Sequence, residues 1–148
     1  MNFKVKPITA AQTILLRHQI LRPHRHVSTA YFDGDDSTDS LHLGAYSGDE
    51  LACVASFMKA QCPGFPTLGA HYQLRGMATA TEWQRRGAGT ALLQYMPTYL
   101  REFDAELVWC NSRINAISFY LKIGFTQSSE PFDIVDVGQH VQMIRSLS

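Results

Sequence analysis

The chain has 148 residues, of which 45% are apolar and 18% charged, and its 13 basic and 13 acidic side chains give a formal net charge of zero. This length and composition indicate one globular domain, residues 1–148, and exclude a disordered chain. The charge balance gives no reason to expect nucleic acid or an anionic membrane as a partner, and no apolar run approaches the roughly 20 residues that span a bilayer.

The cysteine and histidine content argues against a disulfide scaffold and a metal site. Three cysteines are present, an odd number, and they lack the spacing of metal ligands. Three histidines, His18, His24 and His26, straddle a predicted helix end and a Pro-containing loop without a zinc-binding spacing. The N-terminus also lacks the apolar segment of a secretory signal. We therefore expect a cytoplasmic protein with reduced thiols and no metal.

The first third of the chain is predicted to be a strand, a helix and a long loop. Residues 3–8 alternate apolar and polar side chains, as a strand does. Thr9 is a suitable N-cap for a helix over Ala10–Leu21, which Pro23 would end. Residues 22–40 form a long polar loop that we expect to be mobile and to border a site, because long loops in compact domains are usually functional or disordered.

Paired strands come next. Strands are predicted over Leu41–Tyr46 and Leu51–Lys59, joined by a hairpin turn at residues 47–50. A further strand, starting near Ala70 and covering Tyr72–Ala78, precedes a short polar turn.

The second half alternates strands and helices. A helix is entered through Gly87-Ala88-Gly89, and Pro97 within it removes the hydrogen bond to the Leu93 carbonyl, which predicts a kink or an early break. Glu106–Cys110 is a predicted strand, and Asn115–Ile123 a helix ended by Gly124 at the C′ position.

The last predicted strands include Phe125 and Val141–Ile144, with a loop over residues 131–138 between them. A strand–helix–strand–helix unit between hairpins predicts a mixed α/β fold, with parallel and antiparallel pairs in one central sheet of about 6–7 strands flanked by about 4 helices.

The turn from Thr79 to Arg86 and the glycines after it carry the first chemical signal. Gly87 and Gly89 let the backbone approach a ligand closely, and the first N–H groups of the following helix lack intrahelical partners. With Arg85 and Arg86 beside them, these donors suit an anion such as a diphosphate. A tight strand–helix turn without a ligand explains the two glycines equally well.

Two familiar phosphate loops do not fit. A dinucleotide fingerprint requires a third glycine where Leu92 stands. A nucleoside-triphosphate loop requires Gly-Lys-Ser/Thr, and the chain has Gly89-Thr90. An EF-hand over the acidic run from Asp33 also fails, because Thr38 occupies the glycine position and Gly44 the glutamate position.

The stretch does resemble the GNAT superfamily, the acyl-coenzyme A-dependent N-acyltransferases. The family hallmark Gln/Arg-x-x-Gly-x-Gly/Ala is matched at every position by Gln84-Arg85-Arg86-Gly87-Ala88-Gly89. A second family pattern, Asn-x-x-Ala/Ser-x-x-Phe-Tyr-x-x-x-Gly-Phe, is matched nearly throughout by residues 115–125. Two motifs about 30 residues apart, in the right order and elements, are far more specific than either alone.

The resemblance implies a GNAT-like sheet that is partly splayed, and acetyl-coenzyme A as acyl donor. It implies a cofactor site made of Met77, Ala78, Thr79, Gln84, Arg85, Arg86, Gly87, Ala88, Gly89, Thr90, Asn111, Asn115, Phe119 and Tyr120. The backbone of Met77–Thr79 would pair with the pantetheine arm, and an N–H at Met77 or Ala78 would polarise the thioester carbonyl. Residues 84–90 would bind the diphosphate, and Asn115 would cap its helix or reach a ligand amide.

The reaction implied is direct attack of a primary amine, of a small molecule or a peptide, on the thioester within a ternary complex. Tyr120 matches the family position that protonates the leaving thiolate, and its alternatives are a hydrogen bond to the sulfur or a place in the core. Family members are often homodimers, so a second copy is another partner that the resemblance implies.

The general base is left open by the sequence. Glu82, His42, His71 and His140 are candidates, and a chain of water molecules is another. Cys110 would suit an acyl-cysteine mechanism, although a thiol on a strand without a cationic partner is more often inert. A non-catalytic acyl-coenzyme A sensor is the alternative function. The acidic run at Asp33, Asp35, Asp36 and Asp39 would suit a cationic acceptor or be a solvated loop.

Overall fold

The computed structural model describes residues 2–66 and 69–147. Its strands are β1 (Lys4–Pro7), β2 (Leu41–Ser47), β3 (Glu50–Lys59), β4 (Ala70–Thr79), β5 (Ala105–Arg113), β6 (Thr126–Gln127), β7 (Phe132–Ile134) and β8 (Gly138–Ser146). The α-helices are α1 (Ala10–Leu16), α2 (Ala88–Leu100) and α3 (Ile117–Lys122). The shorter helical segments are the π-helix η1 (Arg17–Leu21) and the 3-10 turns η2 (Val27–Ala30), η3 (Thr81–Trp83), η4 (Arg101–Phe103) and η5 (Ile114–Ala116).

The strands form one mixed sheet, as predicted. Their order is β1-β2-β3-β4-β5-β8-β6, and β7 pairs with β8. The β4–β5 pair is parallel, and the other pairs in the described part of the chain are antiparallel. The sheet has eight strands, one more than the upper expectation, and the described residues contain three α-helices where about four were expected.

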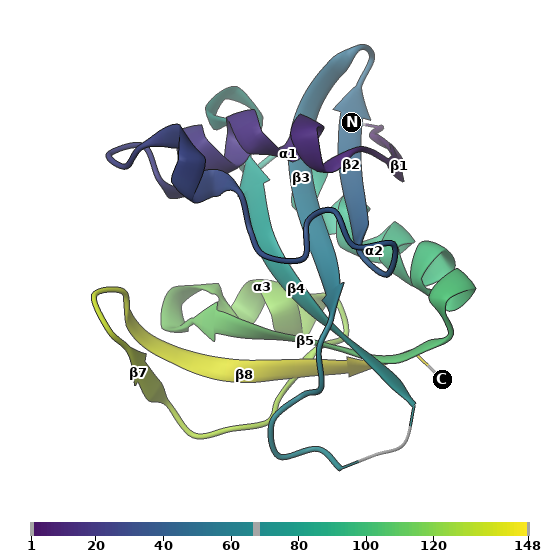
Figure 1. Ribbon diagram of the computed structural model, residues 1–148, viewed down its shortest axis with the longest axis vertical. Coiled ribbons are helices and arrows are strands. Elements are labelled where there is room, and N and C mark those ends of the chain that lie inside the picture. The colour runs from purple at the N-terminus through teal and green to yellow at the C-terminus, as the bar shows by residue number, and fades with distance from the viewer. Residues whose placement is uncertain (1, 67–68, 148) are drawn as a thin grey trace.

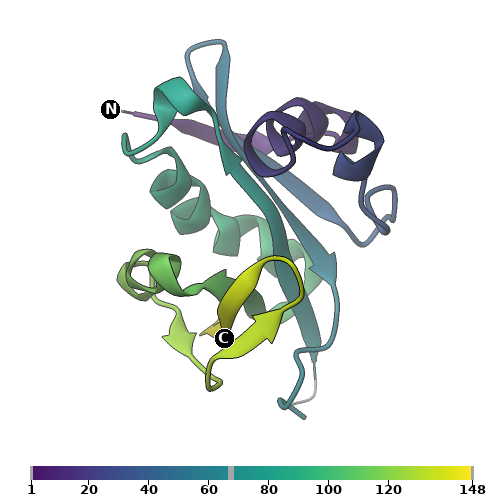
Figure 2. The same cartoon turned by 90° about the vertical axis from the view of Figure 1, so that its left-hand side faces the viewer.

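Helices cover both faces of the sheet. Figure 2 shows α1 and η1 on one side of β3 and β4, and α2 on the other. On the α2 side, Leu92, Leu93, Met96 and Leu100 are fully buried and belong to the main core. On the α1 side, Leu16 packs against Val54 of β3 in a smaller cluster. The described part contains no helix with the length and apolarity that crossing a membrane requires.

The sheet opens at its centre, between β4 and β5. The two strands pair only from Ala70–Gln73 on β4 to Ala105–Trp109 on β5. Past that point β4 continues to Thr79 beside β3, and β5 continues to Arg113 beside β8, so the two strands diverge (Figure 1). One edge of residues 74–79 therefore faces a gap, with main-chain groups that no strand of the described residues pairs.

The first predicted helix changes character halfway. Thr9 caps α1 as predicted, in a reciprocal capping box with Gln12, but the α-helix ends at Leu16 and continues as the π-helix Arg17–Leu21. The switch occurs at Arg17, a fully buried arginine whose side chain is held by the loop that follows.

Two predictions near the C-terminus are wrong. The expected loop at residues 131–138 contains β7, and β8 begins at Gly138 because a hairpin pairs Phe132 with His140 and Ile134 with Gly138. The expected strand at Phe125 lies one residue later, at Thr126–Gln127, because the buried Phe125 still belongs to the turn that closes α3. Gly124, with φ of 94°, occupies the C′ position as predicted.

Pro97 does not end its helix, because a distant arginine replaces the missing donor. Helix α2 runs through Pro97 to Leu100. Proline at position 97 leaves the Leu93 carbonyl without its helical N–H, and Arg145 Nη1 of β8 donates to that carbonyl at 3.3 Å. The orphaned acceptor is thus satisfied across the core.

We expect Arg145→Met to lower the free energy of unfolding by about 1 kcal/mol, the net value of a typical hydrogen bond. In a Pro97→Ala background the same substitution should have an effect near zero, because an alanine at this position supplies the helical N–H itself. Urea denaturation of the parent, the two single variants and the double variant measures this coupling between Arg145 and Pro97. Equal losses in both backgrounds would show that the arginine stabilises the protein in some other way.

Candidate active site

The N-terminus of α2 is an uncapped set of backbone donors. Gly87 is the N-cap residue with φ of 91°, and no side chain caps the helix. The first helical bond runs from Ala91 N to Gly87 O at 2.9 Å, so the N–H groups of Ala88, Gly89 and Thr90 precede it and lack helical acceptors. A Cβ placed on Gly87 would meet no atom of residues 2–66 and 69–147 within 4 Å, so the space before these donors is open in the described structure. The turn fits a diphosphate.

The residues before Gly87 are exposed and are held by neighbouring side chains. Arg85 has φ of 62°, and the Arg86 guanidinium lies 5.3 Å from the centre of the Trp83 ring. Trp83 is itself fixed, because its Nε1 donates to Glu50 Oε2 at 2.6 Å. The Gln84 side chain makes one bond within the protein. Its Nε2 donates to the Thr79 carbonyl at 3.2 Å, which ties the turn to the end of β4.

Three predicted cofactor residues meet at Gly89. A Cβ on Gly89 would lie 2.7 Å from Met77 Cε and 3.4 Å from Phe119 Cζ. The absence of a side chain at Gly89 therefore lets α2, β4 and α3 pack together at the gap. The sequence placed Met77, Gly89 and Phe119 in one site, and the structure brings them together.

Strand alternation decides which main-chain groups of β4 face the gap. Ala80 N donates to Ala52 O of β3 at 2.8 Å, so the hydrogen-bonded position two residues earlier, Ala78, also faces β3. Met77 and Thr79 then direct their main-chain groups to the gap, and the Thr79 carbonyl does accept from Gln84 there. Of the two N–H groups suggested by the sequence for the thioester carbonyl, this geometry favours Met77 over Ala78.

Tyr120 lies at the point where the sheet opens. Its hydroxyl is hydrogen-bonded to Cys110, the first residue of β5 beyond the last β4–β5 pair. Burial raises the pKa of this hydroxyl well above its ordinary value of 10, and the neighbouring Cys110 raises it further. The ring packs edge-on against Phe119 and Phe125, with centroids 5.2 and 5.3 Å away. Tyr120 is therefore a fixed, protonated donor beside the gap.

The two predicted asparagines are not brought into this cluster. Asn115 is exposed in η5, and the N-cap of α3 is Ala116, without a side-chain cap bond. The cap role predicted for Asn115 is absent because the 3-10 turn moves the helix start by two residues. Asn111 alternates with Cys110 along β5, so its side chain lies on the face of the sheet opposite α3.

The histidine candidates for a general base differ in the hydrogen bonds that their ring nitrogens make. Both nitrogens of His42 are within hydrogen-bond distance of fixed groups, Ser56 Oγ at 2.6 Å and the Asp35 carbonyl at 2.9 Å. His71 Nδ1 accepts from the Cys62 N–H at 3.0 Å. His140 Nδ1 lies 2.8 Å from the Gly138 carbonyl, which requires a proton on Nδ1 and leaves Nε2 as an acceptor. The fourth candidate, Glu82, is exposed in η3.

The N-terminal histidines serve the loop after η1. His18 Nε2 lies 2.8 Å from the Arg25 carbonyl, and His26 Nδ1 lies 2.9 Å from Ser28 Oγ. No group of three or more His, Cys, Asp or Glu side chains in residues 2–66 and 69–147 is arranged to hold a metal ion.

A buried polar network beneath that loop was missed in the sequence. Arg17 donates to both carboxylate oxygens of Asp35, at 2.8 and 2.9 Å, to Ser56 Oγ at 2.7 Å and to the Ala30 carbonyl at 3.0 Å. The Asp35 carboxylate also accepts from the Phe32 N–H at 2.9 Å. The segment predicted to be a mobile loop is therefore anchored to η1 and β3. No local pattern distinguishes Asp35 from the exposed aspartates around it.

We expect Asp35→Asn to destabilise the fold by about 3–5 kcal/mol, because it leaves the buried Arg17 guanidinium without a counter-charge. Burial raises the pKa of Asp35, but the bonds from Arg17 and Phe32 and the charges of Arg17 and His42 outweigh it, and the pKa lies below the ordinary 3.8. Asp35 therefore contributes stability that is present above pH 3.8 and is lost as the pH falls through its lower folded pKa. Denaturation of Asp35→Asn and of the exposed neighbour Asp36→Asn, followed as a function of pH, measures the loss of stability and its pH dependence. Similar losses of stability in the two variants would contradict the anchoring role of Asp35.

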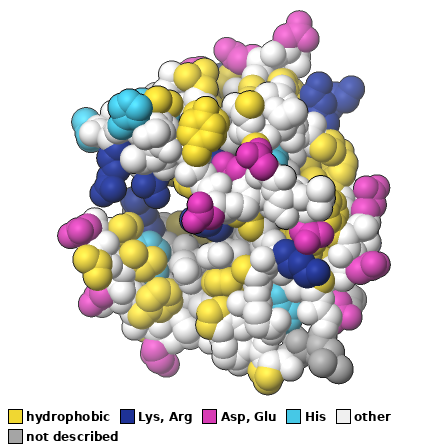
Figure 3. All heavy atoms as spheres, viewed as in Figure 1, with side chains coloured by type: hydrophobic (Ala, Val, Ile, Leu, Met, Phe, Trp, Pro, Cys, Tyr) yellow, Lys and Arg dark blue, Asp and Glu magenta, His cyan; other side chains and the backbone are white. Residues whose placement is uncertain are grey.

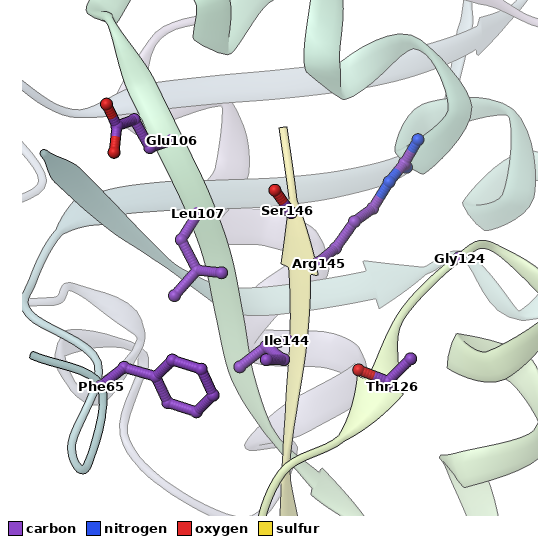
Figure 4. Close-up of a pocket in the computed structure, with 8 residues that line it drawn as sticks. All are labelled: Phe65, Glu106, Leu107, Gly124, Thr126, Ile144, Arg145 and Ser146. Carbon is purple, nitrogen blue, oxygen red and sulfur yellow. The ribbon is translucent and has the colours of Figure 1, made fainter. Parts of the chain in front are cut away.

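Two cavities in the described part of the chain lie away from this site. One, of about 490 Å³, sits at the start of β5 and the end of β8, where Phe65, Leu107 and Ile144 face one another (Figure 4). The other, also about 490 Å³, is a shallow surface between β1 and Tyr95. We place the candidate site where β4 and β5 diverge, because the first N–H groups of α2, the Tyr120 hydroxyl and the unpaired edge of β4 lie together there.

The chain is similar to known acetyltransferases over its whole length. Residues 18–147 match the family model described as acetyltransferase (GNAT) domain. The uncharacterized N-acetyltransferase YitI of Bacillus subtilis is 35% identical over 144 residues, covering 97% of this chain and 96% of that protein. Among solved structures, a putative N-acetyltransferase from Lactobacillus plantarum superposes with a TM-score of 0.77 at 17% identity, covering all of both chains.

Another solved structure of similar fold contains coenzyme A. An acetyltransferase of Bacillus subtilis, solved in complex with CoA, superposes with a TM-score of 0.68 at 16% identity over 98% of this chain and 99% of that one. Likeness at this identity shows the fold, and the family model and the YitI match show the membership. The chain is a member of the GNAT acetyltransferase family, an acyltransferase whose acyl donor is acetyl-coenzyme A.

Proposed function

We propose that the protein transfers the acetyl group of acetyl-coenzyme A to a primary amine by direct attack within a ternary complex. The observation that carries this proposal is the position of the Tyr120 hydroxyl. It lies at Cys110, where β4 and β5 separate, and the uncapped start of α2 packs against the same gap through Gly89. The gap therefore offers anion donors, main-chain pairing groups and a proton donor in one place.

The residues divide by the part of the donor that each would hold. The N–H groups of Ala88, Gly89 and Thr90, with Arg85 and Arg86 at the rim, would bind the diphosphate. The main-chain groups of Met77 and Thr79 would pair with the pantetheine arm, and the Met77 N–H would donate to the carbonyl oxygen that gains charge. Acetyl-coenzyme A supplies the electrophile, an acetyl thioester.

Tyr120 acts on the leaving sulfur. A coenzyme A thiol has an ordinary pKa of about 8.5, and the raised pKa of Tyr120 lies well above that value. Full proton transfer from the phenol to the thiolate is therefore uphill. The chief contribution of Tyr120 is a hydrogen bond that stabilises the developing thiolate, and the released thiol takes its proton from the amine that has attacked.

Direct transfer is favoured over an acyl-cysteine. Burial raises the pKa of Cys110 to about 12, although the hydrogen bond from Tyr120 lowers it in part. A thiol with this pKa is neutral at pH 7 and is a poor nucleophile.

His140 is the residue we propose as base for the amine. Its Nε2 carries the lone pair because Nδ1 donates to the Gly138 carbonyl. His140 pairs with Arg113 at the open end of β5, on the face from which an acceptor can reach the gap. His42 is engaged at both nitrogens and is a structural residue.

The test is acetyl transfer to a panel of primary amines, followed by release of the coenzyme A thiol and by mass spectrometry of the product. The intact mass of the protein, measured after incubation with acetyl-coenzyme A alone, should be unchanged. An acetylated protein would contradict direct transfer. Tight donor binding without transfer to any amine would favour the non-catalytic sensor instead.

A further inference from the structure

An unusual cluster of cations surrounds one aromatic ring on the acceptor side of the site. The Arg17, Arg75 and Arg22 guanidinium carbons lie 3.9, 4.7 and 5.9 Å from the centre of the Phe32 ring. The three arginines come from different parts of the chain: η1, β4 and the start of the long loop. Each such contact is favourable, but together they concentrate positive charge.

Only one of these cations is neutralised. Arg17 is paired with Asp35, and this is the only ion pair within residues 2–66 and 69–147. Arg22 and Arg75 are half-buried and have no carboxylate within 4.0 Å in that part of the chain. The exposed aspartates Asp33 and Asp36 belong to the same loop but do not reach them. The pair therefore presents uncompensated charge beside an aromatic surface.

The cluster lies directly behind the reacting position. Arg75 is paired across the strands with Ser56, whose side chain bonds Arg17, so Arg75 projects toward the α1–η1 face of the sheet. It stands two residues before Met77, whose side chain packs on the opposite face against Gly89. Gly76, between them, is in a bulge with φ of 63°, and a Cβ there would lie 2.7 Å from the Phe32 ring. Phe32 thus sits against the β4 backbone at the gap.

The surface of the molecule agrees with this position of the arginine cluster. Figure 3 shows a hollow on the side of the molecule between the α1–η1 segment and the β7–β8 hairpin, with Lys and Arg side chains gathered at its rim. The proposed donor site lies on the face that carries α2 and α3, so an acceptor would enter from this one. Arg113, exposed on β5, alternates with Cys110 and lies on this face too.

We propose that the acceptor amine carries a carboxylate, which Arg22 and Arg75 bind beside the Phe32 ring. This substrate class rests on the proposed transfer to an amine. Planar guanidinium groups bind carboxylates through paired N–H donors, and two of them unopposed would repel a polyamine or an aminoglycoside. The acidic run suggested a cationic acceptor, but its buried member is paired with Arg17 and the others stay in solvent. A phosphate has the same charge chemistry, so the experiment separates the two.

The test compares matched acceptors with the full chain and acetyl-coenzyme A. Amino acids are paired with their amides, β-alanine with β-alaninamide, and O-phosphoethanolamine with ethanolamine. The amine of an amino-acid amide has a lower pKa than the amine of the amino acid, so a larger fraction of it is unprotonated near neutral pH. A preference for the amino acid therefore cannot come from the fraction of unprotonated amine. We expect kcat/KM at least about tenfold higher for the carboxylate member. Arg22→Gln and Arg75→Gln should each lower it about tenfold, mainly through KM, and Arg75→Glu should reverse the preference. A preference restricted to the phosphate member would overturn the carboxylate assignment.

Controls separate this proposal from the transferase proposal. Calorimetry should give the same acetyl-coenzyme A affinity for all arginine variants. Arg25→Gln, at an exposed arginine of the same loop that is not one of the three around Phe32, should leave the acid-to-amide ratio unchanged. Amides used as well as acids, or a ratio unaffected by the Arg22 and Arg75 variants, would overturn the carboxylate site while the transferase function stands. If no amine is acetylated, ligand-observed NMR of the same pairs decides: binding that depends on Arg22 and Arg75 supports the site, and its absence overturns it.

Discussion

Gly87→Glu is expected to lower the affinity for acetyl-coenzyme A at least a hundredfold while the chain stays folded. The new side chain would start in open space, since nothing lies within 4 Å of a Cβ at Gly87, and its carboxylate would stand before the free N–H groups of α2. Two charges about 4 Å apart near a protein surface interact by about 4 kcal/mol, and about 1.4 kcal/mol is tenfold in affinity. Isothermal titration calorimetry measures the effect.

The control for this variant is Gly87→Ala. Alanine has the same difficulty with a φ of 91°, which lowers stability by roughly 1–2 kcal/mol, but it adds no charge. Its affinity for the donor should remain within a few fold of the parent. If alanine and glutamate weaken binding equally, backbone strain and not the diphosphate site would be responsible. If neither weakens it, the donor lies elsewhere.

Tyr120→Phe is expected to reduce kcat about ten- to a hundredfold with the acetyl-coenzyme A affinity retained. The ring keeps its contacts with Phe119 and Phe125, and only the hydroxyl is lost. The effect falls at or below the low end of general acid catalysis, because a phenol with a raised pKa stabilises a thiolate chiefly by hydrogen bonding. Steady-state kinetics with saturating donor measures it, and an unchanged kcat would remove Tyr120 from the mechanism.

Tyr99→Phe is the matched control. The Tyr99 hydroxyl donates to the Val5 carbonyl at 2.8 Å, so its loss should affect stability and not turnover. The pH dependence gives a second check. Because the pKa of Tyr120 is raised above 10, the hydroxyl stays protonated from about pH 6 to 9, and the parent should show no fall in rate through Tyr120 ionisation in that range. A fall that disappears in Tyr120→Phe would contradict the raised pKa.

The parts of the site that lie close together in sequence were predictable, since local backbone chemistry determines them. Gly87 and Gly89 indicate a tight turn between a strand and a helix, and the structure shows the positive φ at Gly87 and the start of α2 at Ala88. Gly124 likewise indicated the end of α3. The strands β2 and β3 were predicted as partners on either side of a turn with Gly48, and the structure pairs them.

The rest depends on partners far apart in the chain. Arg145 supplies the donor that Pro97 removes from the Leu93 carbonyl, and it does so from 52 residues away, a pairing that no periodicity encodes. The role of Asp35 could not be told from that of Asp36, because only the fold brings Arg17 and Ser56 to it. The family resemblance placed Asn111 in the cofactor site, yet strand alternation turns its side chain away from α3. The acceptor face, which joins Phe32, Arg22 and Arg75, likewise depends on residues that only the fold brings together.

Residue-resolved amide hydrogen exchange, with and without acetyl-coenzyme A, tests most directly that the gap between β4 and β5 is the donor site. We predict slower exchange at Met77 and Thr79 and at Ala88, Gly89 and Thr90, where N–H groups face the gap or begin α2. Exchange slowed instead around Phe65, Leu107 and Ile144, or unchanged throughout the folded chain, would contradict this assignment.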